Sequence, residues 1–262
     1  GLLHPDYDGY FESPREYLEW YQKAEGRRQK AEETTLRSQG SHQSPSKSPN
    51  HHSEPCDLTP QHHNAQTLQL PLQNPKSKIQ NLKSPTVGIL LYRKHVITNQ
   101  AYIPQLIRAF EDAGLIPVPI FINGVEGHVA VRDLMTTAYE QERIAQGIKD
   151  TPSLSKEAVQ VDAIVSTIGF PLVGGPAGSM EAGRQVEVAK RILGAKNVPY
   201  FVSAPLLIQD IHSWTRQGVG GLQSVVLYAL PELDGAIDPV PLGGLVGDQI
   251  YLVPERVKRL TG

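Results

Sequence analysis

The chain has 262 residues, of which 39% are hydrophobic and 20% charged, enough apolar material for one good-sized core. A formal net charge of -2, with no basic stripe among aromatics, argues against nucleic-acid binding. The longest apolar stretches, such as residues 198–207, contain prolines and are too short for a membrane span. The chain starts without an export signal, and its single cysteine, Cys56, suits a reducing compartment. We therefore expect a cytoplasmic protein.

Residues 13–36 are predicted to form a helix, with Ser13 as its N-cap, Pro14 at the first helical position and Glu16 three residues after the cap. The tract that follows, residues 38–84, is rich in Ser, Pro, Gln, Asn, His and Lys and cannot bury enough apolar surface to fold. It is interpreted as a disordered insertion. The expected organisation is a helical segment (1–37), the insertion (38–84) and an α/β domain (85–262).

The α/β domain is predicted from strands and helices that alternate along the chain. Buried or half-buried strands are expected at residues 87–92, 116–122, 161–168, 200–204 and 224–230. Helices are expected at residues 103–113, from about 128, in short pieces within 137–156, and at 180–193. Prolines 117 and 119 suit an edge or irregular position for the second strand. This order favours a doubly wound, mostly parallel sheet with helices on both faces and all strand carboxyl ends on one edge.

The first of two glycine-framed acidic blocks spans residues 174–185, after the predicted strand at 161–168. It has no lysine after its glycines, so it is not an ATP-binding phosphate loop. The backbone amides of Gly174, Gly175 and Gly178 could bind a carboxylate or phosphate of a ligand. The alternative is a tight turn in which Glu181 balances the helix dipole. Arg184 could contact a ligand or pair with Glu181.

The second block spans residues 231–238 and places Glu232, Asp234 and Asp238 within one short turn. Such a density of carboxylates could accept protons or hold a hard cation such as Mg²⁺. The alternative is that the Asp-Gly pair at 234–235 only forms a turn. Between the blocks, His212 could be a ligand or base, although a lone histidine on a helix face is more often structural.

Four segments carry a resemblance to a known family: PQLIRAFEDAGLIPVPIF, VGGPAGSMEAGRQVEVAKRIL, NVPYFVSAPLLIQDI and GGLQSVVLYALPELDGAIDPVPLGGLVGD. They resemble the large porphyrin-binding H subunit of magnesium chelatase, of the cyanobacterial type, which is similar to the large subunit of cobaltochelatase. The resemblance covers residues 85–262 and implies an internal piece of a much longer protein. It also implies a metal-inserting ligase that puts Mg²⁺ into protoporphyrin IX for chlorophyll biosynthesis.

The resemblance implies substrates and partners as well. Mg²⁺ and protoporphyrin IX are expected as substrates, with no tightly bound cofactor. ATP is expected to be hydrolysed by separate AAA+ motor subunits. The other expected partners are the remaining domains of the H subunit and a porphyrin-binding accessory protein, in the cytoplasm or, in plant relatives, the chloroplast stroma.

The chemistry of insertion requires a base for the pyrrole N–H protons and a transient ligand for Mg²⁺. Glu232 and Glu181 are the candidate catalytic residues, and Glu232 and Asp234 the candidate Mg²⁺ ligands. Lys94 and Arg184 are candidates for the propionates. The residues expected to bind the porphyrin are Gly174, Gly175, Gly178, Arg184, Phe170, His212 and Trp214.

Three alternatives remain open from the residues. The chain could be a structural and binding module that is inactive alone, because its cleft is completed by another domain. It could act in a cobaltochelatase on a corrin precursor. It could also be a generic small-ligand or regulatory domain of the doubly wound type.

Overall fold

The computed structural model describes residues 1–39, 84–123, 127–148, 154–173 and 182–262. Residues Gly1–Ala24 and Ser84–Gly262 form one compact unit. The described part of a second unit, residues 25–39, is helical and continues α1 (Pro14–Gln39). The predicted insertion lies almost wholly outside the described residues, and the domain boundaries at 37 and 84 stay predictions.

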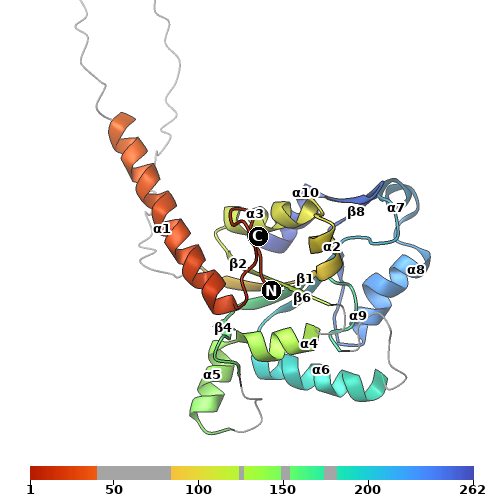
Figure 1. The fold of residues 1–262 in the computed structure, drawn as a ribbon. Helices are drawn as coiled ribbons and strands as arrows, with labels where there is room; N and C mark the ends of the chain where they lie inside the picture. Colours follow the sequence, from red (N-terminus) through yellow and green to blue (C-terminus); the bar gives the residue numbers. More distant parts are fainter. Residues whose placement is uncertain (40–83, 124–126, 149–153, 174–181) are drawn as a thin grey trace, which may run out of the picture. The chain divides into compact units, whose positions relative to one another are not determined.

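The core of the first unit is a five-stranded sheet in which every neighbouring pair is parallel (Figure 1). Its strands are β1 (Thr86–Tyr92), β2 (Ile116–Ile122), β5 (Ala163–Ser166), β6 (Tyr200–Ala204) and β7 (Val240–Pro241). They lie in the order β2-β1-β5-β6-β7. The predicted α/β class and parallel sheet are confirmed.

Strand β2 lies at the edge of the sheet, as its two prolines predict. Pro117 is opposite Val87 and Pro119 opposite Ile89 in the register with β1. Proline cannot donate a ladder hydrogen bond, so an edge strand tolerates it and a central one does not. The carbonyl of Pro117 accepts a hydrogen bond of 2.8 Å from the buried Tyr17 hydroxyl, so the start of α1 covers this edge.

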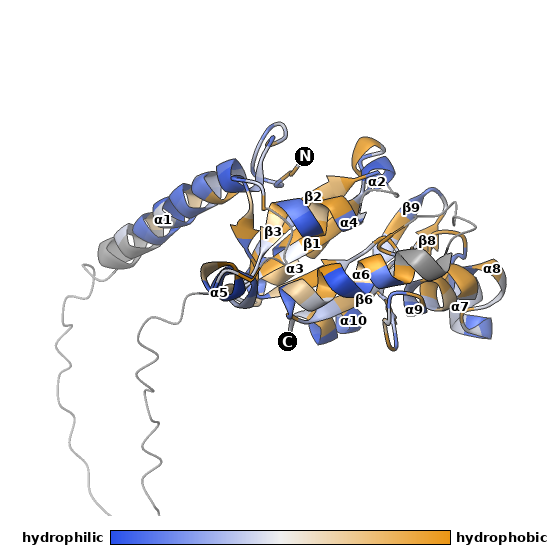
Figure 2. Cartoon of the chain, turned by 90° about the horizontal axis from the view of Figure 1, so that it is seen from below, coloured by the Kyte–Doolittle hydropathy of each residue, from blue (hydrophilic) through white to orange (hydrophobic). Residues whose placement is uncertain are grey.

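Helices cover both faces of the sheet (Figure 1). On one face lie α3 (Tyr102–Asp112) and α10 (Pro254–Thr261); on the other lie α4 (Gly127–Val129), the π-helical segment η1 (Ala130–Leu134) and α6 (Ala182–Lys196). Successive residues of β1 enter the two cores alternately: Ile89 and Leu91 pack with α3, whereas Leu90 packs with the η1 and α6 side. Figure 2, which views the sheet from the side of α4 and α6, shows that its strands are largely hydrophobic.

The remaining elements are short. Two-stranded sheets are formed by β3 (Met135–Thr136) with β4 (Val159–Gln160) and by β8 (Gly243–Val246) with β9 (Gln249–Leu252). The short helices are α2 (Arg93–Ile97), α5 (Ala138–Ala145) and α7 (Ile211–Gln217). The helices predicted from 103, 128, 137 and 180 are all present with shifted ends.

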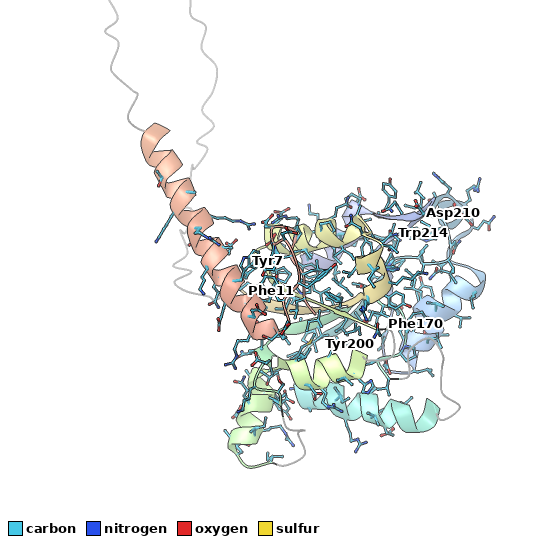
Figure 3. The ribbon with its side chains drawn as sticks, in the orientation of Figure 1. Tyr7, Phe11, Phe170, Tyr200, Asp210 and Trp214 are labelled. Carbon is cyan, nitrogen blue, oxygen red and sulfur yellow. The ribbon has the colours of Figure 1, made fainter. Side chains whose placement is uncertain are left out.

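An aromatic cluster joins the first residues of the chain to this core. Tyr7 and Phe11 stack with ring centroids 4.0 Å apart (Figure 3), and Phe11 meets Tyr17 edge-on at 5.3 Å. His4 and Glu111 of α3 share a 2.9 Å hydrogen bond. Ser13 caps α1 by accepting a hydrogen bond from the Glu16 amide at 3.2 Å, as predicted. Residues 1–24 therefore belong to the same packed unit as the sheet.

The strand predicted at residues 224–230 is wrong, because this run is helical. It contains α8 (Gly221–Ser224), the π-helical segment η3 (Val225–Ala229) and α9 (Leu230–Glu232). A continuous apolar run does not distinguish a buried strand from a packed helix. Pro231 lacks an N–H and would crowd the preceding turn, and the wider π-helical turn relieves that clash. The second acidic block therefore begins within a helix and not after a strand.

Candidate functional site

The strand order points to one place on the sheet edge. Numbered as successive strands of the sheet, β2-β1-β5-β6-β7 reads 2-1-3-4-5, so the winding reverses between β1 and β5. Open α/β sheets bind ligands in the crevice outside the carboxyl ends of such strands. Here those ends are followed by Arg93 after β1 and by Thr167 after β5.

Thr167 and Gly169 shape the chain as it leaves β5. The Thr167 backbone N–H and hydroxyl both donate to the Leu90 carbonyl, at 3.0 and 2.8 Å. Gly169 has a φ of +70°, and a Cβ there would lie 3.4 Å from the Ala204 Cβ and 3.6 Å from the Val226 carbonyl. The loop after β5 is thus held against both β1 and the helical run that precedes the second acidic block.

Aromatic rings line this edge. Tyr92 meets His95 edge-on at 5.4 Å and Phe170 edge-on at 6.5 Å. His95 in turn meets Tyr102, whose hydroxyl lies 2.9 Å from the His95 Nδ1. Phe170 and Tyr92 are only partly buried, so they offer a flat apolar surface next to the switch point.

His95 is neutral in the physiological range. Burial lowers its pKa to about 4, and the adjacent Lys94 ammonium acts in the same direction. The imidazole is 8% exposed. At this edge the His95 imidazole therefore acts as an uncharged hydrogen-bonding group whose position is fixed by the Tyr102 hydroxyl.

The turn of the second acidic block packs against the chain that follows β5. The Asp234 carboxylate, in the second block, accepts a hydrogen bond from the Leu172 amide, two residues before Gly174 of the first block. Asp234 is 8% exposed. The hydroxyl of Tyr200 is buried nearby: burial, and then the Asp234 carboxylate, raise the pKa of this phenol. The contact between Asp234 and Leu172 ties the second acidic turn to the chain entering the first.

Burial also raises the pKa of Asp234 from 3.8 to about 6, against the opposing effect of the Leu172 amide. The protonated carboxyl therefore favours the folded state. Its contribution is complete below about pH 3.8 and is lost as the pH rises through about 6.

This gives a pH-dependent prediction for Asp234→Asn, in which the amide oxygen still accepts from Leu172. Relative to the variant, the wild-type chain should lose about 2 kcal/mol of unfolding free energy between pH 4 and pH 7. Urea unfolding of both proteins at the two pH values measures the difference, in which the other titrating groups cancel. Parallel pH dependence of the two proteins would contradict it.

The other predicted acid–base residues are placed only in part. Glu232 ends α9 and is exposed to solvent. Asp234 is turned inward to Leu172, and its predicted role as a transient Mg²⁺ ligand stays a prediction. Gly174, Gly175, Gly178 and Glu181 lie outside the described residues, as does the Arg184 side chain.

His212 and Trp214 belong to a different part of the molecule. Both lie on α7, where His212 is exposed, and Trp214 packs in a cluster with Ala204, Leu206 and Leu227 that does not include Phe170. The guanidinium of Arg256 lies 4.8 Å from the Trp214 ring centroid. Figure 3 shows Phe170 apart from Trp214 and Asp210. The structure does not bring these predicted porphyrin contacts onto one surface.

Within the described ranges, no group of three or more His, Cys, Asp or Glu side chains is placed to hold a metal ion. The same residues include no helix whose length and hydrophobicity would let it cross a membrane.

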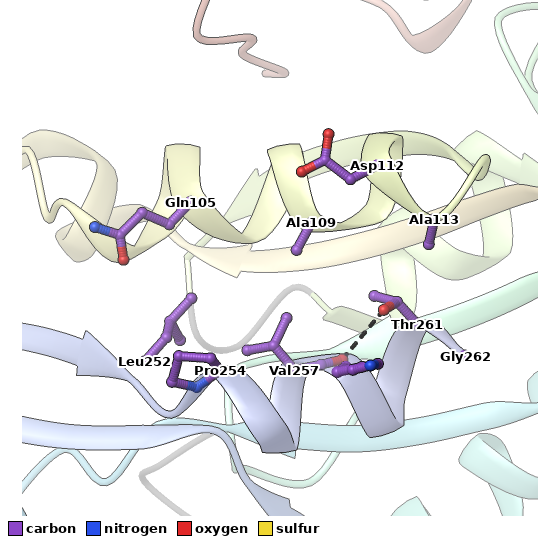
Figure 4. A pocket seen from close by; sticks show the side chains of 10 residues that line it. Gln105, Ala109, Asp112, Ala113, Leu252, Pro254, Val257, Thr261 and Gly262 are labelled. Carbon is purple, nitrogen blue, oxygen red and sulfur yellow. Dashed lines mark hydrogen bonds between the residues drawn. The ribbon is translucent and has the colours of Figure 1, made fainter. Parts of the chain in front are cut away.

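A large hollow lies away from this edge, between α3 and α10 (Figure 4). Its volume is about 710 Å³, and Gln105, Ala109 and Leu252 are among its lining residues. None of the predicted site residues lines it. It is therefore distinct from the candidate site.

Sequence reasoning did not select Tyr92, Arg93, His95 or Tyr200 as site residues. The available signal for Tyr92, Arg93 and His95 was their position. Tyr92 ends a predicted buried strand and the other two follow it directly, which is where α/β proteins bind their ligands. Tyr200 had no such signal, because its electrostatic interaction with Asp234 depends on the path of the helical run.

Most of the chain is similar to one family of known proteins. The family model described as CobN/Magnesium Chelatase matches residues 30–262. The magnesium-chelatase H subunit of Chlorobaculum parvum is 40% identical over 179 residues, which cover 68% of this chain and 12% of the relative. The magnesium-chelatase ChlH subunit of Oryza sativa subsp. indica, named chloroplastic, is 28% identical over 170 residues, 64% of this chain and 11% of the relative.

A solved structure is also similar, the catalytic subunit of cobaltochelatase from Mycobacterium tuberculosis. It matches with a TM-score of 0.46 and 24% identity, over 68% of this chain and 14% of that one. The matched part of the chain thus spans only about an eighth of the length of these proteins.

Proposed function

Because the chain belongs to the CobN/magnesium chelatase family, we propose that it is one domain of a magnesium chelatase H subunit and contributes to inserting Mg²⁺ into protoporphyrin IX. The relatives named as magnesium chelatase subunits favour magnesium and a porphyrin over cobalt and a corrin precursor. The activity of the whole protein requires the domains beyond this chain.

One observation supports placing the porphyrin at the carboxyl edge of the sheet. Asp234 bonds Leu172, so the turn that carries Glu232 lies beside the chain that enters the first glycine block. The same edge presents the partly buried rings of Tyr92 and Phe170. A flat apolar macrocycle needs such a surface, and an acid–base residue must lie beside it.

In this proposal Glu232 accepts a pyrrole proton and guides Mg²⁺, and Glu181 is the second carboxylate of the relay. Mg²⁺ is a substrate and dehydrates reluctantly, so exposed carboxylate oxygens can replace its waters one by one. Asp234 holds the turn that carries Glu232. Gly174, Gly175, Gly178 and Arg184 are proposed to contact the porphyrin beside Glu181.

We further propose that separate AAA+ motor proteins hydrolyse ATP for this reaction and that an accessory protein delivers the porphyrin. The proposed location is the cytoplasm, or the chloroplast stroma in plants; the rice relative is named chloroplastic. A pull-down of the motor proteins by the full-length H subunit tests the first partner.

The binding surface is tested by Phe170→Ala in the full-length protein. Removing this ring should raise the porphyrin Kd by about 10-fold, since an aromatic contact of this size contributes about 1 kcal/mol beyond its burial. Fluorescence quenching during porphyrin titration measures Kd. Phe201→Ala is the matched control, because Phe201 is 47% exposed and lies on β6 away from the switch point.

An unchanged Kd for Phe170→Ala would remove the porphyrin from this edge and favour the structural-module alternative. Equal weakening by Phe170→Ala and Phe201→Ala would indicate a loss of folding rather than of a contact.

A further inference from the structure

Two adjoining hollows open at the carboxyl ends of β1 and β2. The first, of about 280 Å³, is lined by Tyr92, Arg93, Lys94, Ile97, Thr98 and Asn123. The second, of about 390 Å³, shares Arg93 and Asn123 with it. Asn123 directly follows β2, and Arg93 directly follows β1. The two shared residues therefore stand between the hollows, at the carboxyl ends of β1 and β2. Strand β1 also borders the switch point.

Two cations of this edge have no acidic partner among the residues that the structure describes. Arg93 and Lys94 are exposed, and among the described residues no carboxylate lies within ion-pair distance of either. By contrast, Arg108 and Arg132 each pair with an acid. His95, next in the chain, is kept neutral by burial and by Lys94. Two adjacent positive charges beside a hollow favour an anionic ligand.

An apolar surface lies directly beside these charges. Tyr92 lines the smaller hollow and also meets Phe170 edge-on at 6.5 Å. A ligand that binds here would place anionic groups at residues 93–94 and a flat ring over the aromatic pair. The Asn123 amide adds a neutral hydrogen-bond donor to the same hollow.

We propose that Arg93 and Lys94, with Asn123, bind the carboxylates of the two propionate groups of the tetrapyrrole and so fix which edge of the ring enters the site. The proposal rests on the proposed function of this edge. Arg93 offers a planar fork that matches a carboxylate, and Lys94 a mobile point charge. No covalent step is involved: these residues position the macrocycle for the groups that accept its protons.

The test compares two ligands that differ only in their carboxylates, protoporphyrin IX and its dimethyl ester, titrated into the full-length protein under identical conditions. Wild type should bind the diacid at least roughly 10-fold more tightly than the diester, because a hydrogen bond to a charged group contributes about 1.5–3 kcal/mol. The double variant Arg93→Gln/Lys94→Gln should bind the diacid about 10- to 100-fold more weakly, with the diester Kd unchanged within about 2-fold.

A matched control is available on α6, where Lys190 and Arg191 are also adjacent and exposed. Lys190→Gln/Arg191→Gln makes the same charge change and should leave both Kd values unchanged within about 2-fold. Arg93→Lys, which keeps the charge, should retain most of the preference for the diacid. This rescue separates a charge contact from a packing role.

Three results would overturn the inference: an unchanged diacid Kd in the double variant, equal weakening of both ligands, or an equal effect of the α6 control. Wild type could bind the diacid and insert Mg²⁺ while the double variant still prefers the diacid to the diester. In that case only the assignment of the propionates to Arg93 and Lys94 fails. If wild type binds neither ligand, the proposed function fails with it.

Discussion

Replacing Lys196 by methionine should lower the free energy of unfolding by about 3–5 kcal/mol, the typical cost of removing one partner of a buried ion pair. The Lys196 Nζ lies 2.8 and 3.0 Å from the two Glu140 oxygens and donates to the Met135 carbonyl at 2.6 Å. The two side chains are 1% and 0% exposed. In the variant, the Glu140 carboxylate would stay buried without a cation.

Urea unfolding of this chain measures the loss. The matched control is Lys190→Met on the same helix, because Lys190 pairs with Glu187 at 3.1 Å with both side chains mostly exposed; it should cost less than about 0.5 kcal/mol. Lys196→Met/Glu140→Leu should recover much of the loss, since it removes both buried charges. Equal effects of Lys196→Met and Lys190→Met would show that the buried pair has no special role.

The pair also helps to fix the position of α6. Lys196 also accepts, through its carbonyl, a 2.6 Å hydrogen bond from the Thr137 hydroxyl at the start of α5. The carboxyl end of α6 is thereby fixed to β3 and α5. The other end of the same helix continues from the first acidic block.

Glu232→Gln in the full-length protein should reduce kcat for Mg²⁺ insertion by roughly 100- to 10,000-fold, the range expected for losing a general base. Glutamine keeps the shape but cannot accept a proton. Porphyrin Kd should change little, because the carboxylate acts on the reaction and not on the apolar face of the ring. Turnover with the motor proteins and porphyrin titration measure the two quantities.

Glu181→Gln tests the second carboxylate, and Glu187→Gln, an exposed residue of α6, controls for charge. Loss of turnover with retained binding in one variant identifies the base. If Glu232 and Glu181 form one relay, the double variant should be little worse than the more severe single variant. Normal turnover in both single variants would remove the carboxylate mechanism from this domain.

Local patterns predicted most of the sheet and its nearest helices. The strands at 116–122 and 200–204 have the predicted bounds, and the helix at 102–112 follows its apolar spacing. The edge position of β2 is one of the two placements that its prolines favour. These features depend on residues close in the sequence. Their hydrophobic periodicity and their allowed backbone conformations are the same whatever the rest of the fold is.

The predicted site residues that the structure describes do not all lie together, and the reason is different. Phe170 and the turn with Asp234 do lie at the switch-point edge, but His212 and Trp214 pack elsewhere. Chain order alone does not say whether a helix after β6 returns towards the switch point or packs on α10. The cation–π contact between Trp214 and Arg256 is made between segments about forty residues apart and has no local signature.

The sequence was thus sufficient to predict the α/β class, the sheet edge that is proposed to bind the ligand, and the family resemblance. Hydrophobic periodicity, the positions of proline and glycine, and long motifs are all properties of contiguous residues. Folding in three dimensions determined that residues 224–230 form a helix, that Asp234 is buried against Leu172, and that Arg93 stands between two hollows. Those outcomes depend on desolvation and on contacts between distant segments, which act only once the chain is packed.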